Sequence, residues 1–334
     1  MILNDRFPTK PPRREYISEA GKIFLASLPR RDSAIDVDAL EKIGRGGAHD
    51  VYGHHGDRRF VLKVNHRLLE RVQRSQSGPK EMLARLERNV GEQNARNKEV
   101  YDAFGEEDCL VEDLVLDKVL IHEDGSEKIV TTILTLQEKT HAFSDATKFD
   151  FSGPYTERET SKISTEDYIK LTRPLFSDEL DRDALASHDH TYERLFPLLE
   201  NDALFKHVMR EFIERFRSYY AKMGTILDFV GNENVLFYQE NGVWRFQLGS
   251  VFKGGGSKQD LAAALDLMET DPEAYLASDW QQNTIHNVFA NARLLNATAL
   301  AIGAPRIFDI PLSPKQIDVL SGEYKRKRDL SVHV

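Results

Sequence analysis

The sequence predicts an α+β protein of two lobes, a small β-rich first lobe with one long helix and a mainly helical second lobe. The first lobe is predicted by short segments rich in Val, Ile and Thr, separated by glycine and charged turns, with a helical stretch at 81–104 between them. Helical spacing of apolar residues over 203–223, and again beyond residue 260, predicts the second lobe. The expected divisions are an N-terminal extension (1–36), the first lobe (37–141), a polar insertion or linker (142–190), the second lobe (191–320) and a basic tail (321–334).

The composition is that of a folded, acidic protein. Of its 334 residues 40% are hydrophobic, and the formal net charge of -9 argues against a nucleic-acid partner, which would need a basic face. The dense basic cluster at 325–328 is expected to be a solvated tail, with a docking signal as the alternative. Cys109 is the only cysteine, which favours a reducing compartment, the cytoplasm. No apolar run approaches the roughly 18 residues of a membrane helix, so no membrane span is expected.

The elements of the first lobe follow from local patterns. Residues 17–28 are amphipathic and predict a helix that packs on the main body. Residues 51–64 predict a β-hairpin around a glycine-containing turn, and Pro79 can open the long helix. Three further strands are expected after that helix, at 109–115, 118–122 and 128–136.

The second lobe has clearer helical signals. A short helix is expected at 192–196, ended by Pro197, and the apolar face of the helix over 203–223 must be buried. Glu240-Asn241-Gly242 predicts a hairpin turn between two strands. Helices are expected to resume at 260–268, 271–276 and 280–302, with Asp260 as the N-cap of the first.

The first group of candidate site residues surrounds a glycine turn. Gly44 and Gly46 lie between two predicted strands, Val51 follows them, and Lys63 comes twelve residues later in an apolar strand. Glycines let backbone amides approach phosphates, and an alternating strand can aim a lysine at the same phosphates. The alternatives are an ordinary hairpin and a solvated lysine.

At these residues the sequence resembles the protein-kinase-like superfamily. Gly44, Gly46 and Val51 match its glycine loop in register, and Lys63 matches the lysine of its third strand, although His49 replaces the third glycine. The resemblance implies a kinase-like N-lobe and C-lobe that bind ATP. It also implies that Lys63 grips the phosphates and pairs with a glutamate of the next helix. The candidates are Glu81, Glu87, Glu92 and Glu99, with Glu92 preferred near the middle, and the hinge facing adenine would be Leu136 to Thr140, including Gln137.

The second group of candidates resembles the kinase catalytic loop. Asp228 follows two apolar residues, and Asn234 leads into an apolar strand, so the resemblance implies that Asp228 orients the acceptor's proton and Asn234 holds a metal ion. A plain turn stabilised by an aspartate is the alternative. The loop is one residue longer than the family's, and Ile226 and Leu227 stand where the family has His or Tyr and Arg. Activation by loop phosphorylation is therefore not expected.

The family's second metal-binding aspartate is replaced in this chain. The resemblance places Gln247 at that position, thirteen residues beyond Asn234. A glutamine coordinates through a neutral oxygen, so weak Mg²⁺ binding is expected. The glycines at 254–256 replace a long activation segment. His188 and His190 invite a separate metal interpretation, with a solvated loop as the preferred alternative.

These patterns lead to two functional hypotheses. The first is an atypical ATP-dependent phosphotransferase that acts on a protein or a small molecule through Lys63 and Asp228, with Mg²⁺ at Asn234 and Gln247. The second is a non-catalytic pseudokinase that serves as a binding or scaffolding module for a protein partner. An unrelated α+β fold is a third, minor alternative. The likeness to bacterial kinase-like proteins and secreted effectors keeps export into a host cell open beside a cytoplasmic location.

Overall fold

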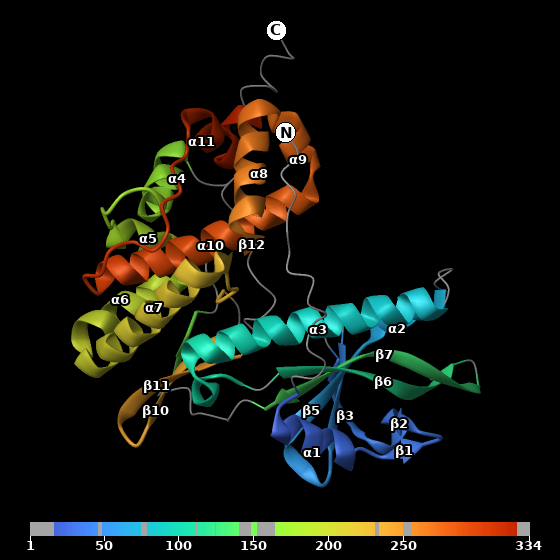
Figure 1. Cartoon of the computed structure of the whole chain (residues 1–334). Coiled ribbons are helices and arrows are strands. Elements are labelled where there is room, and N and C mark those ends of the chain that lie inside the picture. The colour runs from blue at the N-terminus through green and yellow to red at the C-terminus, as the bar shows by residue number, and fades with distance from the viewer. Residues whose placement is uncertain are drawn as a thin grey trace. The chain divides into compact units, whose positions relative to one another are not determined.

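A computed structural model gives the architecture of the chain (Figure 1). It describes residues 17–45, 49–74, 79–110, 112–123, 125–139, 148–151, 164–230, 234–249 and 256–325. The chain divides into two compact units, Met1–His141 and Ala142–Val334. Helices and strands occur in both units, as expected for an α+β protein.

The first unit is built on a seven-stranded sheet with the order β1-β2-β6-β7-β5-β4-β3. Neighbouring strands are antiparallel except β2 and β6, which run parallel. The predicted hairpin is confirmed as β4 and β5, whereas the two short strands predicted between residues 109 and 122 form one long strand, β6. The strands are β1 (Arg30–Arg31), β2 (Ala34–Asp36), β3 (Glu41–Arg45), β4 (His49–His54), β5 (Asp57–Asn65), β6 (Glu112–Glu123) and β7 (Ser126–Glu138).

The segment predicted to be an extension contributes to the sheet and the core of the first unit. Helix α1 (Glu19–Ser27) starts at the N-cap Ser18, and the ring of Phe24 stacks on Phe60 at a centroid distance of 5.4 Å. After α1, strand β2 lies beside β6, with Ile35 opposite Val119. All four of these apolar side chains belong to one buried cluster, so residues 17–36 cannot be removed without exposing it.

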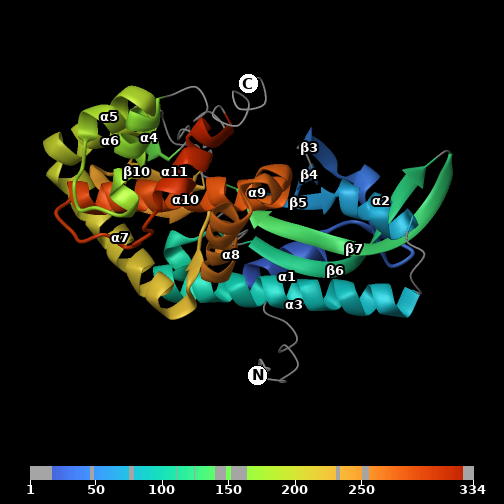
Figure 2. The ribbon, with the colours of Figure 1, turned by 90° about the horizontal axis from the view of Figure 1, so that it is seen from above.

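Helix α3 (Pro79–Phe104) is continuous, as predicted, and follows α2 (His66–Arg74), which the sequence did not predict. Figure 2 shows α3 running along β6 and β7. Its contact with β6 is partly polar: Asn94 bonds both main-chain groups of Leu114, and Asn97 Nδ2 donates to the carbonyl oxygen of Glu112 at 2.6 Å. The first unit also contains the short 3-10 helices η1 (Val37–Ala39) and η2 (Glu106–Asp108).

The second unit is mainly helical, with a three-stranded sheet of order β11-β10-β8 and a β9-β12 pair. The described part of the segment predicted as a polar insertion is folded: it contains β8, α4, η5 and α5. The elements are β8 (Lys148–Asp150), α4 (Thr165–Thr172), η5 (Arg173–Leu175), α5 (Arg182–His188), α6 (His190–Asn201), α7 (Ala203–Met223), β9 (Thr225–Ile226), β10 (Val235–Glu240), β11 (Val243–Leu248), β12 (Gly256–Ser257), α8 (Lys258–Thr270), α9 (Pro272–Ala277), α10 (Asp279–Ala301) and α11 (Pro314–Leu320).

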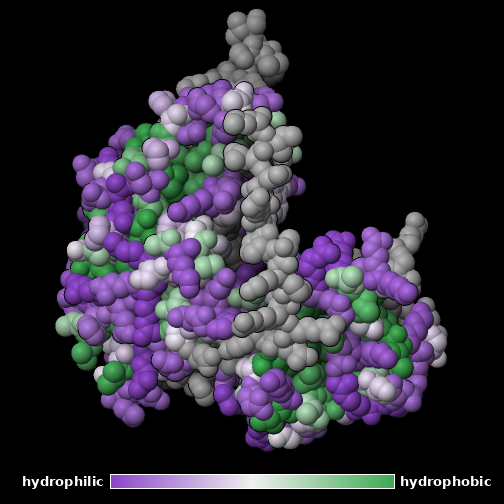
Figure 3. Space-filling view, in the orientation of Figure 1, coloured by the Kyte–Doolittle hydropathy of each residue, from purple (hydrophilic) through white to green (hydrophobic). Residues whose placement is uncertain are grey.

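Aromatic side chains form the core between α7 and the three-stranded sheet. The ring of Phe237 lies 5.4 Å from Phe212, 5.8 Å from Phe205 and 6.1 Å from Phe149. The predicted apolar face of α7 is buried, and Tyr219 belongs to it. Where Figure 3 shows the surface, hydrophilic residues predominate, in keeping with apolar groups gathered inside.

The structure answers three local predictions made for the second unit. The hairpin turn is confirmed, with positive φ angles of 52° at Asn241 and 78° at Gly242, as a type I′ turn requires. Pro197 lies inside α6 and does not end it, so that prediction was wrong; the helix continues to Asn201. Asp260 is not an N-cap either: Ser257 caps α8, and Asp260 bonds back to it in a capping box.

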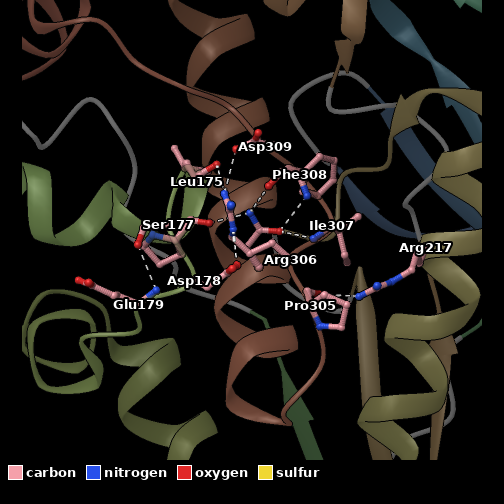
Figure 4. Close-up of polar contacts among 12 residues, drawn as sticks. Leu175, Ser177, Asp178, Glu179, Arg217, Pro305, Arg306, Ile307, Phe308 and Asp309 are labelled. Carbon is pink, nitrogen blue, oxygen red and sulfur yellow. Dashed lines mark hydrogen bonds and ion pairs between the residues drawn. The ribbon is translucent and has the colours of Figure 1, made fainter.

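A buried asparagine anchors the segment that follows α10. Asn296 Nδ2 donates to the carbonyl oxygens of Pro174 and Phe308, while its Oδ1 accepts from the N–H groups of Ile307 and Phe308. Beside it, Arg306 bonds Asp178 and Asp309, as Figure 4 shows. Polar contacts to the buried side chain of Asn296 therefore fix the path of the chain after α10.

Candidate functional site

The glycine turn and Lys63 lie in one part of the first sheet. Strand pairing puts Lys63 opposite Val51, and Val51 opposite Gly44, so the three residues form a row across β5, β4 and β3. Directly opposite residues point to the same face of a sheet. Lys63 is partly buried, and its neighbours along β5, Leu62 and Val64, belong to the core. The structure thus brings together three of the predicted nucleotide-site residues, while Gly46 lies outside the described residues.

Gly44 has no local reason to be a glycine. Its φ angle is not in the left-handed region, and a Cβ added to it would meet no atom within 4 Å. Neither backbone conformation nor packing among the described residues therefore requires a hydrogen at this position. A ligand that comes close to the main chain of Gly44 from the solvent side would explain why this residue is a glycine.

The glutamates of α3 are placed differently from one another. Glu81, Glu87 and the preferred candidate Glu92 are exposed, whereas Glu99 is partly buried. Gln137 lies within β7, where it pairs with Val61 on one side and Glu112 on the other. Because the main chain of Gln137 sits inside the sheet, the part of the predicted hinge free of strand pairing begins beyond β7, and residues 140–147 lie outside the described range.

Asp228 occupies a partly buried position in the second unit. It follows β9 and is flanked by the buried side chains of Leu227 and Phe229. Burial raises the pKa of the Asp228 carboxyl above its ordinary value, and hydrogen bonds from Asn291 and from the N–H of Val230 partly oppose that rise. A carboxylate whose pKa is raised by burial accepts a proton more readily than an exposed carboxylate does.

Asn234 closes the loop that Asp228 opens. Its Nδ2 donates to the carbonyl oxygen of Asp228 at 3.1 Å and to that of Val230 at 3.4 Å. The carbonyl oxygen of Asn234 accepts from Gly249 N at 2.8 Å, which starts the β10-β11 hairpin. The two residues of the predicted catalytic loop are therefore held together, although 231–233 between them lie outside the described residues.

Gln247 lies on the same hairpin. It stands opposite Leu236 in β11, and because side chains alternate along a strand, it projects to the same face as Asn234. Its Oε1 is buried and has no hydrogen-bond partner among the described residues. A buried amide oxygen without a donor is destabilising by about 1 to 3 kcal/mol, and a cation at this position would remove that penalty.

The described residues contain no group of three His, Cys, Asp or Glu side chains that could hold a metal ion. The amide oxygens of Asn234 and Gln247 are the donors that a hard cation would use here. The alternative metal interpretation at His188 and His190 gains no support, because His188 Nδ1 contacts the carbonyl oxygen of Ala184 and His190 contacts Glu193.

One site residue was missed by the sequence analysis. Asn291 lies in α10, more than sixty residues from Asp228 in the chain, and its side chain bonds the main chain of Phe229 and Val230 and the carboxylate of Asp228. It is fully buried between Ala290 and Ala292. An asparagine inside an apolar helical stretch was the available signal, because a buried amide must find partners.

The described helices include none that is long and apolar enough to cross a lipid bilayer. Comparison with protein-family models, with curated proteins and with solved structures finds no match to this chain.

Proposed function

We propose that this chain is an atypical ATP-dependent phosphotransferase that acts on a hydroxyl group of a protein or a small molecule. The observation that carries the proposal is the cluster at the start of the β10-β11 hairpin. There Asn234 is bonded to the Asp228 loop, and Gln247 presents on the same face a buried oxygen that has no hydrogen-bond partner within the described part of the chain. A proton acceptor together with oxygen ligands for a cation supports phosphoryl transfer, which depends on positioning and charge neutralisation.

Features of the first unit support the proposal of a phosphate site. The row of Gly44, Val51 and Lys63 combines open space over the backbone with one cation. A lysine ammonium neutralises phosphate charge, and backbone amides of a glycine turn can bond phosphate oxygens. The partial burial of Lys63 supports nucleotide binding over the alternative of a fully solvated hairpin lysine.

In the proposed transfer, the acceptor's hydroxyl oxygen forms a bond to the γ-phosphorus of ATP while the bond from that phosphorus to the bridging oxygen breaks. The hydroxyl proton passes to Asp228. Asn234 and Gln247 fit a Mg²⁺ ion through their amide oxygens. When bound, such an ion neutralises charge that develops on the phosphate oxygens. Both donors are neutral, so the protein alone holds the ion weakly.

A pseudokinase is the second candidate, and Gln247 favours it. An uncharged residue at this position leaves a bound cation without an anionic protein ligand, and a protein that binds nucleotide without transfer would tolerate that loss. The partner of such a module would be a protein.

Two measurements separate these hypotheses. Calorimetry of Mg-ATP binding should show loss of binding in Lys63→Ala but not in Lys118→Ala, a matched exposed lysine of β6. Equal affinity of both variants for Mg-ATP would contradict the assignment of Lys63 to a nucleotide site. Incubation with γ-labelled ATP and a cell extract should then label an acceptor in the wild type and not in Asp228→Asn. Binding without any transfer would identify the pseudokinase.

A further inference from the structure

Helix α10 carries an exposed tryptophan near its start. The Trp280 side chain is 67% exposed, the largest exposed fraction of any large hydrophobic side chain in the described part of the chain. Single exposed aliphatic side chains are common and need no explanation. A tryptophan differs from them, because its large flat indole gains most when a ligand or partner covers it. The hydroxyl group of Thr284 donates to the Trp280 carbonyl oxygen at 3.0 Å, within the first turns of the helix.

Two asparagines continue from Trp280 toward Asp228. Positions 280, 287 and 291 share one side of the helix, which we call the α10 face, and they extend over about 16 Å along its axis. Asn287 is exposed, and its carbonyl oxygen accepts from Nδ2 of Asn291 at 2.8 Å. Asn291 is buried, and its Nδ2 also lies 3.3 Å from Asp228 Oδ1. The α10 face therefore leads from an exposed aromatic ring to the carboxylate.

The side chains along the α10 face suit an uncharged ligand. Between Asp279 and Arg293 the sequence has no Asp, Glu, Lys or Arg, and His286 is the only titratable side chain there. A ligand with charged groups would form no ion pair with the neutral amides and the indole of this face. A carboxamide offers two donors and an acceptor, which matches hydroxyl groups that both donate and accept. An aromatic ring covers the apolar C–H surface between such hydroxyl groups.

We infer that the acceptor that meets Asp228 is a neutral oligosaccharide, with one ring stacked on Trp280 and a hydroxyl group bonded to the amide of Asn287. This inference rests on the proposed phosphotransferase function. A sugar hydroxyl oxygen bonds the γ-phosphorus of ATP, the bond to the bridging oxygen breaks as ADP leaves, and the hydroxyl proton passes to Asp228. A single sugar ring is shorter than the face, which extends over about 16 Å, so the acceptor is a chain.

Binding is tested without ATP, by calorimetry of the full chain with four neutral linear pentasaccharides: maltopentaose, cellopentaose, xylopentaose and chitopentaose. We expect at least one of them to bind. Trp280→Ala should weaken that affinity about tenfold or more, and Asn287→Ala about threefold to tenfold. Trp280→Phe, which keeps a ring, should retain most of the affinity. Leu204→Ala is the matched control, because it removes an exposed apolar side chain from α7, and it should change nothing.

Two results of the binding test would overturn the inference. One is that none of the four pentasaccharides binds at millimolar concentration. The other is that Trp280→Ala and Leu204→Ala have the same affinity, because the indole would then not contact the sugar.

A transfer experiment separates this inference from the proposed function. With γ-labelled Mg-ATP, the pentasaccharide that binds should become labelled by the wild type and not by Asp228→Asn. Sugar binding that depends on Trp280, without any transfer, would uphold the α10 face as an oligosaccharide site and reject the phosphotransferase function. Label on a protein of a cell extract, but on none of the four sugars, would uphold the phosphotransferase function and overturn the oligosaccharide acceptor.

Discussion

Asn94 of α3 meets the main chain of Leu114 with both ends of its amide. Oδ1 accepts from Leu114 N at 3.0 Å, and Nδ2 donates to the Leu114 carbonyl oxygen at 2.8 Å. Strand β2 pairs with β6 only at Val119 and Leu120, so at Leu114 the asparagine takes the place of a neighbouring strand. Asn94, together with Asn97 at Glu112, thus ties a long helix to a stretch of β6 beside which β2 does not pair.

We predict that Asn94→Leu destabilises the protein by about 1 to 3 kcal/mol, because it leaves the partly buried N–H and C=O of Leu114 without this partner. Asn89→Leu is the control, since Asn89 is exposed on the same helix. Urea unfolding of both variants measures the difference. Equal stabilities would show that water replaces the amide at no cost.

Gly21 of α1 lies too close to Asp113 to carry a side chain. A Cβ at this position would lie 2.2 Å from Asp113 Oδ2, the oxygen that accepts from Ser18 N and Oγ. Glycine to alanine in a helix normally stabilises by about 1 kcal/mol. Here we expect Gly21→Ala to lower stability by about 1 to 3 kcal/mol through overpacking. Adding Asp113→Ala should remove that further loss, as a double-mutant cycle in urea would show; strictly additive effects would contradict the contact.

His122 predicts a pH dependence of stability. Its Nδ1 contacts Asp38, and its Nε2 lies 3.1 Å from Glu127 Oε1. The hydrogen bond to Glu127, with a further bond to Asp38, raises the pKa of His122 above 6.5, and the bond from His122 chiefly lowers the pKa of Glu127 below 4.5.

The two pKa shifts limit the stabilising contribution of the His122–Glu127 pair at opposite ends of a pH range. A raised histidine pKa contributes stability that is complete below the unfolded value and is lost as pH rises through the folded value. A lowered glutamate pKa contributes stability that is complete above its unfolded value and is lost as pH falls through the folded one. We therefore expect the pair to contribute most between pH 4.5 and 6.5. NMR titration of His122 in folded and urea-unfolded protein tests this, and a folded midpoint at or below the unfolded one would refute it.

Asn296 is expected to be the strongest single anchor of the segment after α10. Asn296→Leu leaves four main-chain groups of Pro174, Ile307 and Phe308 without their partner, and we predict a loss of about 3 kcal/mol or more. Hydrogen exchange of the Ile307 and Phe308 amides should accelerate more than that of α7. Asn287→Leu on the exposed face of α10 is the control. Unchanged exchange at both amides would show that Arg306 and its carboxylates suffice.

Local sequence patterns were enough to find most elements with one strong signal. The apolar face of α7 and the Asn241-Gly242 turn were predicted correctly, because periodicity and positive-φ residues act over a few positions. Pro197 was misjudged because the proline removes one main-chain hydrogen bond inside α6, while the buried Tyr192, Leu195 and Leu199 hold the helix across it. Helix α2 was missed for lack of a long apolar face.

The candidate site divides in the same way. Asp228 with Asn234, and Gly44 with Lys63, lie near each other in the chain, so their spacing already suggested that they act together. Asn291 is far from both, and no local pattern connects it to Asp228. A helical wheel shows that position 291 is buried but not which main chain it meets.

The sequence by itself therefore determined the elements that carry a strong local signal, such as α7 and the Asn241-Gly242 turn, because backbone preferences and apolar periodicity are local properties. Only the tertiary structure decided which polar groups become partners. Asn94 with Leu114, Asn291 with Asp228 and Asn296 with Phe308 each join separate elements. Burial forces every such amide to be satisfied, but the identity of its partner depends on how whole elements pack.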